Sequence, residues 1–258
     1  MKNLGKNKVS KILNQKRNQL GVNNYYNYLL IKINKKTELN FIGNNLFIYI
    51  LSCKDPKAII KINKNYTSIK KENLFKIKKN KFDLVKIDLK GSASILFVYR
   101  EKKTSSKKQP VSIKKVKDIY SVTKPWGYEQ WLTGLKNKQF AFKRIFLKKG
   151  TKTSLQYHVK KVESNYLYKG KARLHYMNKN IPLIKNNFSK ILKATKSNTI
   201  NQGHVINVKP KTIHRLEAIS NLILFEVSSP HLSDVVRVSD DSNRPDGKIK
   251  DEHKKKIA

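Results

Sequence analysis

The sequence predicts an all-β protein made of two β-domains, and three observations support this prediction. Short segments rich in Ile, Val, Phe and Tyr follow one another over residues 25–100 and again over residues 116–240. Turn-forming residues separate these segments, and no helical periodicity interrupts either series. Residues 101–115 are charged, contain Ser and Pro and lack periodicity, which is typical of a linker. Many short strands without intervening helices are typical of a sandwich or a barrel.

The first β-domain follows a polar, basic arm at residues 1–24. Val9, Ile12, Leu13 and Leu20 have rough helical spacing in this arm, which favours a short surface helix or a disordered segment. The domain holds no histidine, so no imidazole ligand is available in it. We expect its strands at residues 25–33, 40–52, 58–64, 67–71, 74–79, 83–89 and 92–100.

The second β-domain opens with SVTKPWGYEQWL at residues 121–132, which contains both tryptophans, Trp126 and Trp131. The last residues, 241–258, are polar and predict a surface tail. Between these ends we expect strands at residues 140–148, 154–158, 164–170, 172–177, 181–184, 190–195, 204–208, 212–218 and 222–229.

The two β-domains share the same succession of short strands and turns, which indicates a degenerate repeat. Residues 66–98 and residues 193–227 both read as a short strand, a turn, two further strands and a final apolar strand. Asp83 and Leu84 fall where His214 lies in the second copy. The first copy would therefore lack that histidine.

The net charge of +40 is extreme, yet its composition does not favour nucleic-acid binding. Lysine supplies 50 of the 57 basic residues and arginine only 7, and the lysines are spread over almost the whole chain. Base readout and phosphate forks favour arginine. The abundance of Lys, Asn and Ile is typical of an AT-rich genome, so we expect no nucleic-acid partner. A phosphorylated substrate would still profit from the positive field.

The single cysteine, Cys53, rules out an internal disulfide and a Cys-based zinc site. The N-terminal residues contain no apolar core of a secretory signal, and no run of about 18 apolar residues could span a membrane. We therefore expect a cytoplasmic protein without a membrane partner.

The segment Gly150–Gly170, GTKTSLQYHVKKVESNYLYKG, carries the residues with the most chemistry. Gln156 and His158 are two residues apart, so they share one face of a strand. Glu163 can return beside them on the next strand, and His214 in PKTIHRLE can complete the set. Two imidazole nitrogens and two oxygens suit zinc, manganese, iron, cobalt or nickel. Without a metal, the same groups would be hydrogen-bonded polar residues in a barrel.

These motifs resemble the cupin superfamily. Gly150, Gln156, His158, Glu163 and Gly170 keep every interval of the first cupin motif, with Gln156 in place of its first histidine. Gly203 and His214 keep the spacing of the second motif, although Lys209, Lys211 and Ala218 replace its Pro, Gly and Asn. The SLQYH, KPWG and IHRLE segments resemble the C-terminal cupin domain of type II phosphomannose isomerases, over residues 122–240.

The resemblance implies a double-stranded β-helix, or jelly-roll barrel, and makes the chain a bicupin with a degenerate first copy. It implies a metal-dependent sugar-phosphate isomerase of the mannose-6-phosphate type, with zinc as the expected metal, that supplies nucleotide-sugar and polysaccharide synthesis. It also associates Arg215 with catalysis, and Glu217 and His175 are alternative candidates for the base. Strand alternation instead turns Arg215 and Glu217 away from His214, as in a surface ion pair. Lys143 and Lys160 are candidates for binding the phosphate.

Other functions fit parts of the sequence. A cupin could bind a sugar or a nucleotide sugar without turnover, as the partner of a separate nucleotidyltransferase. The 10 glycines are scattered and form no phosphate loop, so we expect no transferase activity in this chain. An iron dioxygenase or a sugar epimerase is another cupin alternative. By analogy with other cupins, a homodimer is plausible.

Overall fold

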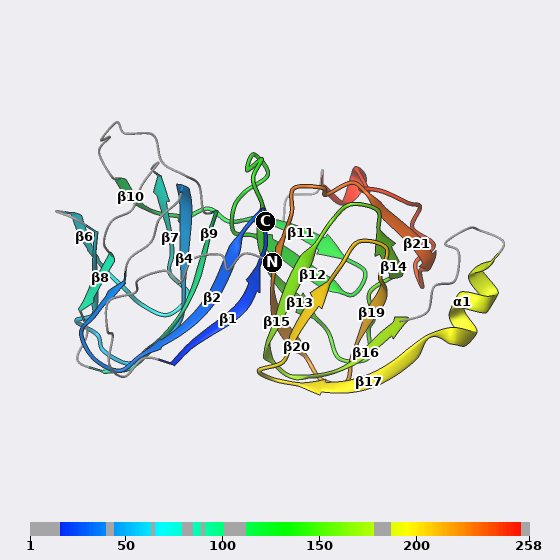
Figure 1. Cartoon of the computed structure of the whole chain (residues 1–258), viewed down its shortest axis with the longest axis horizontal. Coiled ribbons are helices and arrows are strands. Elements are labelled where there is room, and N and C mark those ends of the chain that lie inside the picture. The colour runs from blue at the N-terminus through cyan, green and yellow to red at the C-terminus, as the bar shows by residue number, and fades with distance from the viewer. Residues whose placement is uncertain are drawn as a thin grey trace, which may run out of the picture. The chain divides into compact units, whose positions relative to one another are not determined.

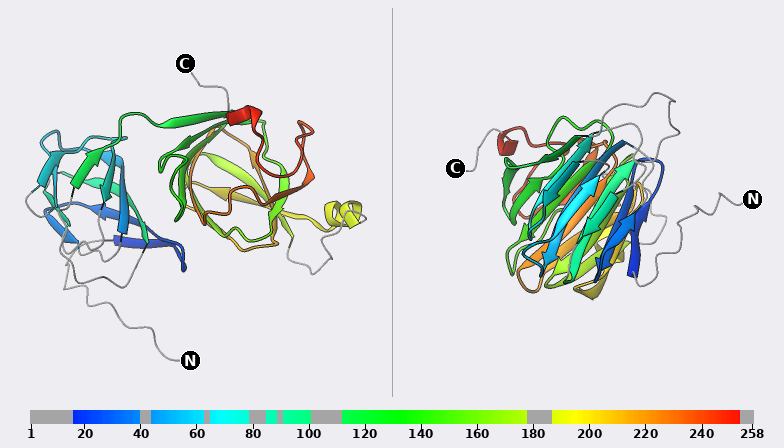
Figure 2. Two further views of the ribbon diagram at one scale, coloured as in Figure 1. Left: turned by 90° about the horizontal axis from the view of Figure 1, so that it is seen from above. Right: turned by 90° about the vertical axis from the view of Figure 1, so that its left-hand side faces the viewer.

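The computed structural model describes residues 16–39, 44–62, 65–78, 85–88, 91–100, 112–177 and 187–253. The chain divides into two compact units, Met1–Lys117 and Asp118–Ala258. Strands dominate both units (Figures 1 and 2), which confirms the all-β prediction. No helix in the described ranges is long and apolar enough to cross a membrane.

The N-terminal unit is built from two antiparallel sheets. Apolar side chains such as Leu29, Ile48 and Phe97 form its core. The larger sheet has the order β1 (Lys16–Val22), β2 (Asn27–Ile33), β9 (Ala93–Arg100), β4 (Asn44–Cys53), β7 (Leu74–Lys78) and β10 (Ser112–Lys115). The smaller sheet has the order β3 (Thr37–Leu39), β8 (Val85–Asp88), β5 (Ile59–Ile62) and β6 (Asn65–Ser68).

The C-terminal unit also has two antiparallel sheets. The first has the order β11 (Tyr120–Lys124), β12 (Gly127–Trp131), β13 (Ala141–Leu147), β20 (Leu222–Ser228), β15 (Glu163–Lys169) and β18 (Val205–Val208). The second has the order β17 (Lys196–Asn201), β16 (Lys171–Met177), β19 (Ile213–Ala218), β14 (Leu155–His158) and β21 (Val235–Ser239).

Eight consecutive strands have the same topology in both units. The order β2-β9-β4-β7 in the first unit corresponds to β13-β20-β15-β18 in the second, and β3-β8-β5-β6 corresponds to β14-β19-β16-β17. Each set of eight strands in two sheets is a jelly roll. The expected repeat is present, since residues 66–98 hold β6 to β9 and residues 193–227 hold β17 to β20. Asp83 and Leu84 lie outside the described residues.

The register of one ladder lets individual positions of the two jelly rolls be compared. The β2–β9 ladder runs from Asn27–Tyr99 to Ile33–Ala93, and the β13–β20 ladder runs over seven pairs from Ala141–Ser228 to Leu147–Leu222. The pair Lys143–Glu226 therefore corresponds to the pair Leu29–Phe97. By the adjoining ladders, Glu163 corresponds to Leu46. Polar interior positions of the second unit are thus hydrocarbon in the first.

Two edge strands occupy segments that were predicted as an arm and a linker. Asn23 Oδ1 accepts hydrogen bonds from the backbone N–H groups of Tyr25 and Tyr26, at 2.8 and 3.1 Å, in the turn that joins β1 to β2. Within the predicted arm, Lys16–Val22 forms strand β1, and within the predicted linker, Ser112–Lys115 forms strand β10. Edge strands can be polar and short, so composition did not reveal them. Residues 1–15 and 101–111 lie outside the described residues.

The strand predicted at residues 190–195 is wrong, because Phe188–Ala194 forms the helix α1. Phe188, Ile191 and Ala194 recur every three residues, which places them on one face of a helix. All three pack in one hydrophobic cluster, and Ile191 is fully buried. The strand predicted at residues 181–184 lies outside the described residues.

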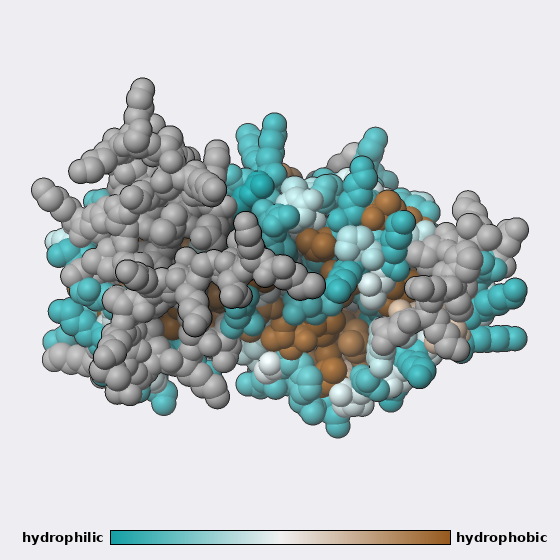
Figure 3. All heavy atoms as spheres, viewed as in Figure 1, coloured by the Kyte–Doolittle hydropathy of each residue, from teal (hydrophilic) through white to brown (hydrophobic). Residues whose placement is uncertain are grey.

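The face of the molecule drawn in Figure 3 does not gather its polar residues in one place. Figure 3 shows hydrophilic residues at many points of the coloured surface, together with a hydrophobic area in the C-terminal unit. This distribution agrees with the spread of the lysines along the sequence.

Replacing Gly170 with alanine should destabilise the C-terminal unit more than replacing Gly203. Both glycines have positive φ angles, of 100° and 95°, which cost an L-residue about 1–2 kcal/mol. A Cβ at Gly170 would also lie 2.4 Å from Asn221 O, whereas a Cβ at Gly203 would meet nothing within 4 Å. We expect the clash to add about 1–3 kcal/mol. Urea unfolding followed by tryptophan fluorescence reports on this unit alone, because both tryptophans lie in it. Equal losses of unfolding free energy in Gly170→Ala and Gly203→Ala would contradict the prediction.

Candidate metal centre

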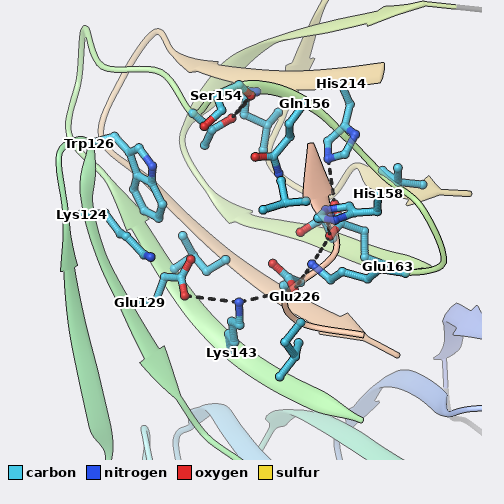
Figure 4. A pocket seen from close by; sticks show the side chains of 18 of the residues that line it. Lys124, Trp126, Glu129, Lys143, Ser154, Gln156, His158, Glu163, His214 and Glu226 are labelled. Carbon is cyan, nitrogen blue, oxygen red and sulfur yellow. Dashed lines mark hydrogen bonds and ion pairs between the residues drawn. The ribbon is translucent and has the colours of Figure 1, made fainter. Parts of the chain in front are cut away.

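Three of the predicted metal ligands converge inside the C-terminal jelly roll. His158 ends β14, Glu163 begins β15 and His214 lies on β19. One ligand atom from each lies within 4.8 Å of the others, and all three residues are buried. His214 Nε2 is 3.1 Å from Glu163 Oε1, and His158 Nε2 is 3.6 Å from Glu163 Oε2 (Figure 4). We call these residues the triad.

The Nδ1 atom of each imidazole contacts an oxygen atom, which orients Nε2 of both rings toward Glu163. His158 Nδ1 is 3.1 Å from Asp234 Oδ1, and His214 Nδ1 is 3.0 Å from the carbonyl oxygen of Thr212. Such contacts fix the tautomer of metal-binding histidines. His158 Nε2 is buried and has no hydrogen-bond partner. An orphaned buried acceptor beside a carboxylate and a second imidazole fits a divalent metal ion.

Gln156, the fourth predicted ligand, lies on the same side of the barrel. It pairs with His214 in the register of β14 and β19 and lines the same pocket. Figure 4 shows its side chain beside His214. Its amide oxygen as a fourth ligand stays a prediction.

The electrostatics keep two members of the triad, His158 and Glu163, in forms that can bind a cation. Burial lowers the pKa of His158 to about 4, assisted by the positive charge of Lys161. Burial alone would raise the pKa of Glu163, but Lys161 and the hydrogen bond with His214 outweigh it and hold that pKa well below its ordinary value. At neutral pH, His158 is therefore uncharged and Glu163 is a carboxylate. Burial opposes the charging of His214, yet its contacts with Glu163 raise its pKa.

The triad opens into a cavity of about 150 Å³. One part of its wall is apolar and includes Trp126, Ile145, Leu147, Leu174, Leu216 and Leu224. The other part is charged and was largely missed by the sequence analysis. Both parts belong to the C-terminal unit.

The charged wall is a row of four buried residues, Glu129, Lys143, Glu226 and Lys161, which we call the charged row. Lys143 Nζ lies 3.2 Å from Glu129 Oε2 and 3.7 Å from Glu226 Oε1. Lys161 Nζ lies 2.9 Å from Glu226 Oε1 and 2.5 Å from Glu163 Oε2. The row thus alternates in sign and ends on a triad carboxylate. Glu226 could have been found as a charge inside the apolar strand LILFEVS.

Of the other predicted site residues, Lys143 lines the cavity, whereas Lys160, Arg215 and Glu217 do not. Lys143 lies inside the charged row, and Lys160 is exposed. Arg215 and Glu217 lie on the opposite face of β19, as strand alternation predicts. Arg215 Nη2 donates to the carbonyl oxygen of Ser239 at 2.9 Å, and Glu217 Oε2 is 2.8 Å from His175 Nε2. Their catalytic roles stay predictions that this placement does not support.

The predicted surface tail instead packs on the barrel and forms part of the cavity wall. Asp240 and Glu252 accept ion pairs from Arg244, at 2.7 and 3.3 Å, and Glu252 also pairs with Lys124 at 2.6 Å. His253 stacks on Tyr120 and meets the edge of Trp131, with ring centroids 6.1 and 5.6 Å apart. Arg244, Gly247, Lys248, Ile249 and His253 all line the cavity. Residues 254–258 lie outside the described part of the chain.

The sequence missed this segment because its contacts are ionic and aromatic rather than aliphatic. Val235–Ser239 alternates and forms β21, which pairs with β14. Beyond it, Arg237 Nη1 donates to the carbonyl oxygens of Pro245 and Gly247, which holds the chain without any apolar period.

Arg244→Ala should loosen this segment, whereas Lys248→Ala should not. Arg244 is largely buried and contacts Asp240, Glu252 and Ser154, while Lys248 is exposed. Removing one partner of a buried ion pair costs about 3–5 kcal/mol, and this partly exposed pair should cost somewhat less. Urea unfolding measured by tryptophan fluorescence checks the difference. If both variants unfold like the wild type, the segment is not held by Arg244.

Comparisons with known proteins agree with this geometry. A family model described as mannose-6-phosphate isomerase C-terminal matches residues 112–240, half of the chain. No curated protein matches the sequence significantly.

Solved structures of oxalate decarboxylases have a similar fold. One mutant from Bacillus subtilis has a TM-score of 0.60 and 11% identity, and the match covers 86% of this chain and 74% of that chain. Another structure of that enzyme concerns its Mn(II) centres, with the same TM-score, identity and coverage. A formate complex from Lactobacillus farciminis has a TM-score of 0.56 and 10% identity, over 82% of this chain and 79% of that chain. These identities show the cupin fold alone. Because the family model matches half of the chain, the chain belongs to the mannose-6-phosphate isomerase C-terminal family of cupins.

Proposed function

We propose that the C-terminal unit is a metal-dependent sugar-phosphate isomerase of the mannose-6-phosphate type. The observation that carries the proposal is the buried triad with the unpartnered Nε2 of His158, in a chain of this family. Zinc is the metal we propose first, and manganese, iron, cobalt and nickel suit the same mixed donors.

An aldose–ketose isomerase moves a proton between C1 and C2 of the sugar through an enediolate. A divalent ion held by His158, Glu163, His214 and Gln156 would polarise the sugar's carbonyl and hydroxyl oxygens. The apolar wall with Trp126, Leu216 and Leu224 excludes water from the reacting carbons. Arg237, Arg244 and Lys248 line the cavity and are the cationic groups that would attract a phosphate.

A second candidate is sugar or nucleotide-sugar binding without turnover, beside a separate nucleotidyltransferase. One observation favours it. The three carboxylates that line the cavity, Glu129, Glu163 and Glu226, are all ion-paired with lysines. A carboxylate paired in this way is a weak base, so none of these three carboxylates is well suited to carry the proton.

Metal binding should depend on both imidazoles of the triad. We expect His158→Ala and His214→Ala to weaken zinc or manganese binding by at least about 10–100-fold, because each removes one ligand. His204→Ala is the matched control, since His204 is exposed and its ring nitrogen contacts the backbone of Asn201, away from the triad. Calorimetric titration of the metal-stripped full-length protein measures the affinities. Unchanged binding in both triad variants would reject the metal centre.

Turnover separates the two candidate functions. The isomerase should convert mannose-6-phosphate to fructose-6-phosphate, lose this activity on chelation and regain it when metal is added back. A coupled assay for fructose-6-phosphate measures the rate, and a panel of hexose phosphates tests the sugar. Saturable sugar binding without any turnover would favour the second candidate and reject the isomerase.

A further inference from the structure

The two jelly rolls of this chain show that the fold does not need the charged row. In the N-terminal unit, Leu29 and Phe97 occupy the ladder positions of Lys143 and Glu226. Both are almost completely buried, at 2% and 0% exposure, inside an apolar core. The same chain therefore builds the same topology with hydrocarbons at these positions.

Buried ion pairs are a poor means of stabilising a fold. Taking charges out of water costs several kcal/mol for each ion, and well-packed apolar residues in their place are often neutral or stabilising. Glu129, Lys143, Glu226 and Lys161 are nevertheless all buried in the C-terminal unit. The charged row is therefore better explained by the cavity that it lines than by folding.

The row places one ammonium directly beside the triad. Lys161 Nζ contacts Glu163 Oε2 at 2.5 Å and Glu226 Oε1 at 2.9 Å, and Lys161 lines the cavity. The backbone N–H of Lys161 donates to Asp234 Oδ2 at 2.8 Å, and Asp234 Oδ1 also contacts His158. One carboxylate thus positions both a triad histidine and this lysine.

We propose that Lys161 binds, beside the triad, the substrate oxygen that becomes negatively charged during isomerisation. Glu226, Lys143 and Glu129 are then positioning residues, which hold the Lys161 ammonium in place. The proposal rests on the isomerase function proposed above and names a catalytic residue for it.

The chemistry of the ammonium supports this role. An ammonium carries three N–H donors. Lys161 donates one of them to Glu163, while Glu226 Oε1 lies 2.9 Å away as an ion pair outside hydrogen-bond geometry. A further N–H is therefore left for an oxygen in the cavity. As the carbonyl becomes an enediolate, this hydrogen bond strengthens, while the proton stays on Lys161. A preorganised donor of this kind commonly contributes about 100–1,000-fold in rate.

The neighbouring lysine provides a matched control. Lys160 precedes Lys161 in the sequence, but it is exposed and does not line the cavity. The variants Lys161→Met, Lys161→Arg and Lys160→Met therefore compare the same chemistry inside and outside the cavity.

The test combines kinetics with metal titration on the full-length protein. We expect Lys161→Met to lower kcat about 100–1,000-fold, Lys161→Arg to restore part of it, and Lys160→Met to stay within about 3-fold of the wild type. Metal affinity of Lys161→Met should be unchanged or higher, because Glu163 loses a competing cation. A purely structural lysine predicts instead that metal affinity and kcat fall together.

Ligand binding gives a readout that does not depend on turnover. A sugar-phosphate hydroxamate mimics the enediolate, and its affinity for the metal-loaded protein can be measured by calorimetry. We expect at least about 10-fold weaker binding to Lys161→Met and none of this loss in Lys160→Met. Wild-type kcat and affinity in Lys161→Met would overturn the role of Lys161 alone, whereas a wild-type protein without turnover would reject the isomerase function as well.

A triple variant tests whether the positioning residues serve the fold or the site. The variant combines Glu129→Gln, Lys143→Leu and Glu226→Leu, which removes three of the four charges of the row. The fourth, Lys161, stays paired with Glu163, so no charge is left unpaired. We expect an unfolding midpoint no lower than that of the wild type, together with a lower kcat. A midpoint well below that of the wild type would show that the row is structural and overturn this part of the proposal.

Discussion

A carboxylate buried in a barrel must find cations, and the arrangement of the C-terminal unit follows from this requirement at Glu163. Lys161 in the turn before β15 and His214 on β19 supply its positive partners, and the uncharged His158 on β14 lies 3.6 Å away. Because these elements belong to both sheets, the site is complete only when the two sheets face each other. Asp234, at the start of β21, then fixes the turn and His158 together.

Much of this site was predictable because ligand spacing and strand period are local properties. Gln156, His158, Glu163 and His214 were identified from intervals in the sequence, and the structure brings the triad together. The choice of Lys160 over Lys161 could not be decided locally. The direction of each side chain in that turn depends on the hydrogen bonds of Asp234, which lies more than seventy residues further along the chain.

Elements without a clear apolar periodicity could not be predicted from the sequence either. The helix at Phe188–Ala194 has only two turns of amphipathic signal, and short segments of this kind also read as strands. The segment after β21 is held by Arg237, Arg244 and His253 through contacts that carry no periodicity. Polar composition predicts a solvated tail in such a case, although Arg237, Arg244 and His253 all have partners.

The shared ladder of the two jelly rolls has a consequence for how each can change over evolutionary time. The apolar interior around Leu29 and Phe97 can exchange one hydrocarbon for another, one position at a time. The charged row cannot, since losing Lys143 or Glu226 alone leaves an opposite charge stranded away from water. Substitutions there must arrive in compensating combinations. The apolar interior of the N-terminal jelly roll can therefore change one residue at a time, whereas the charged row of the C-terminal jelly roll can change only through coordinated substitutions.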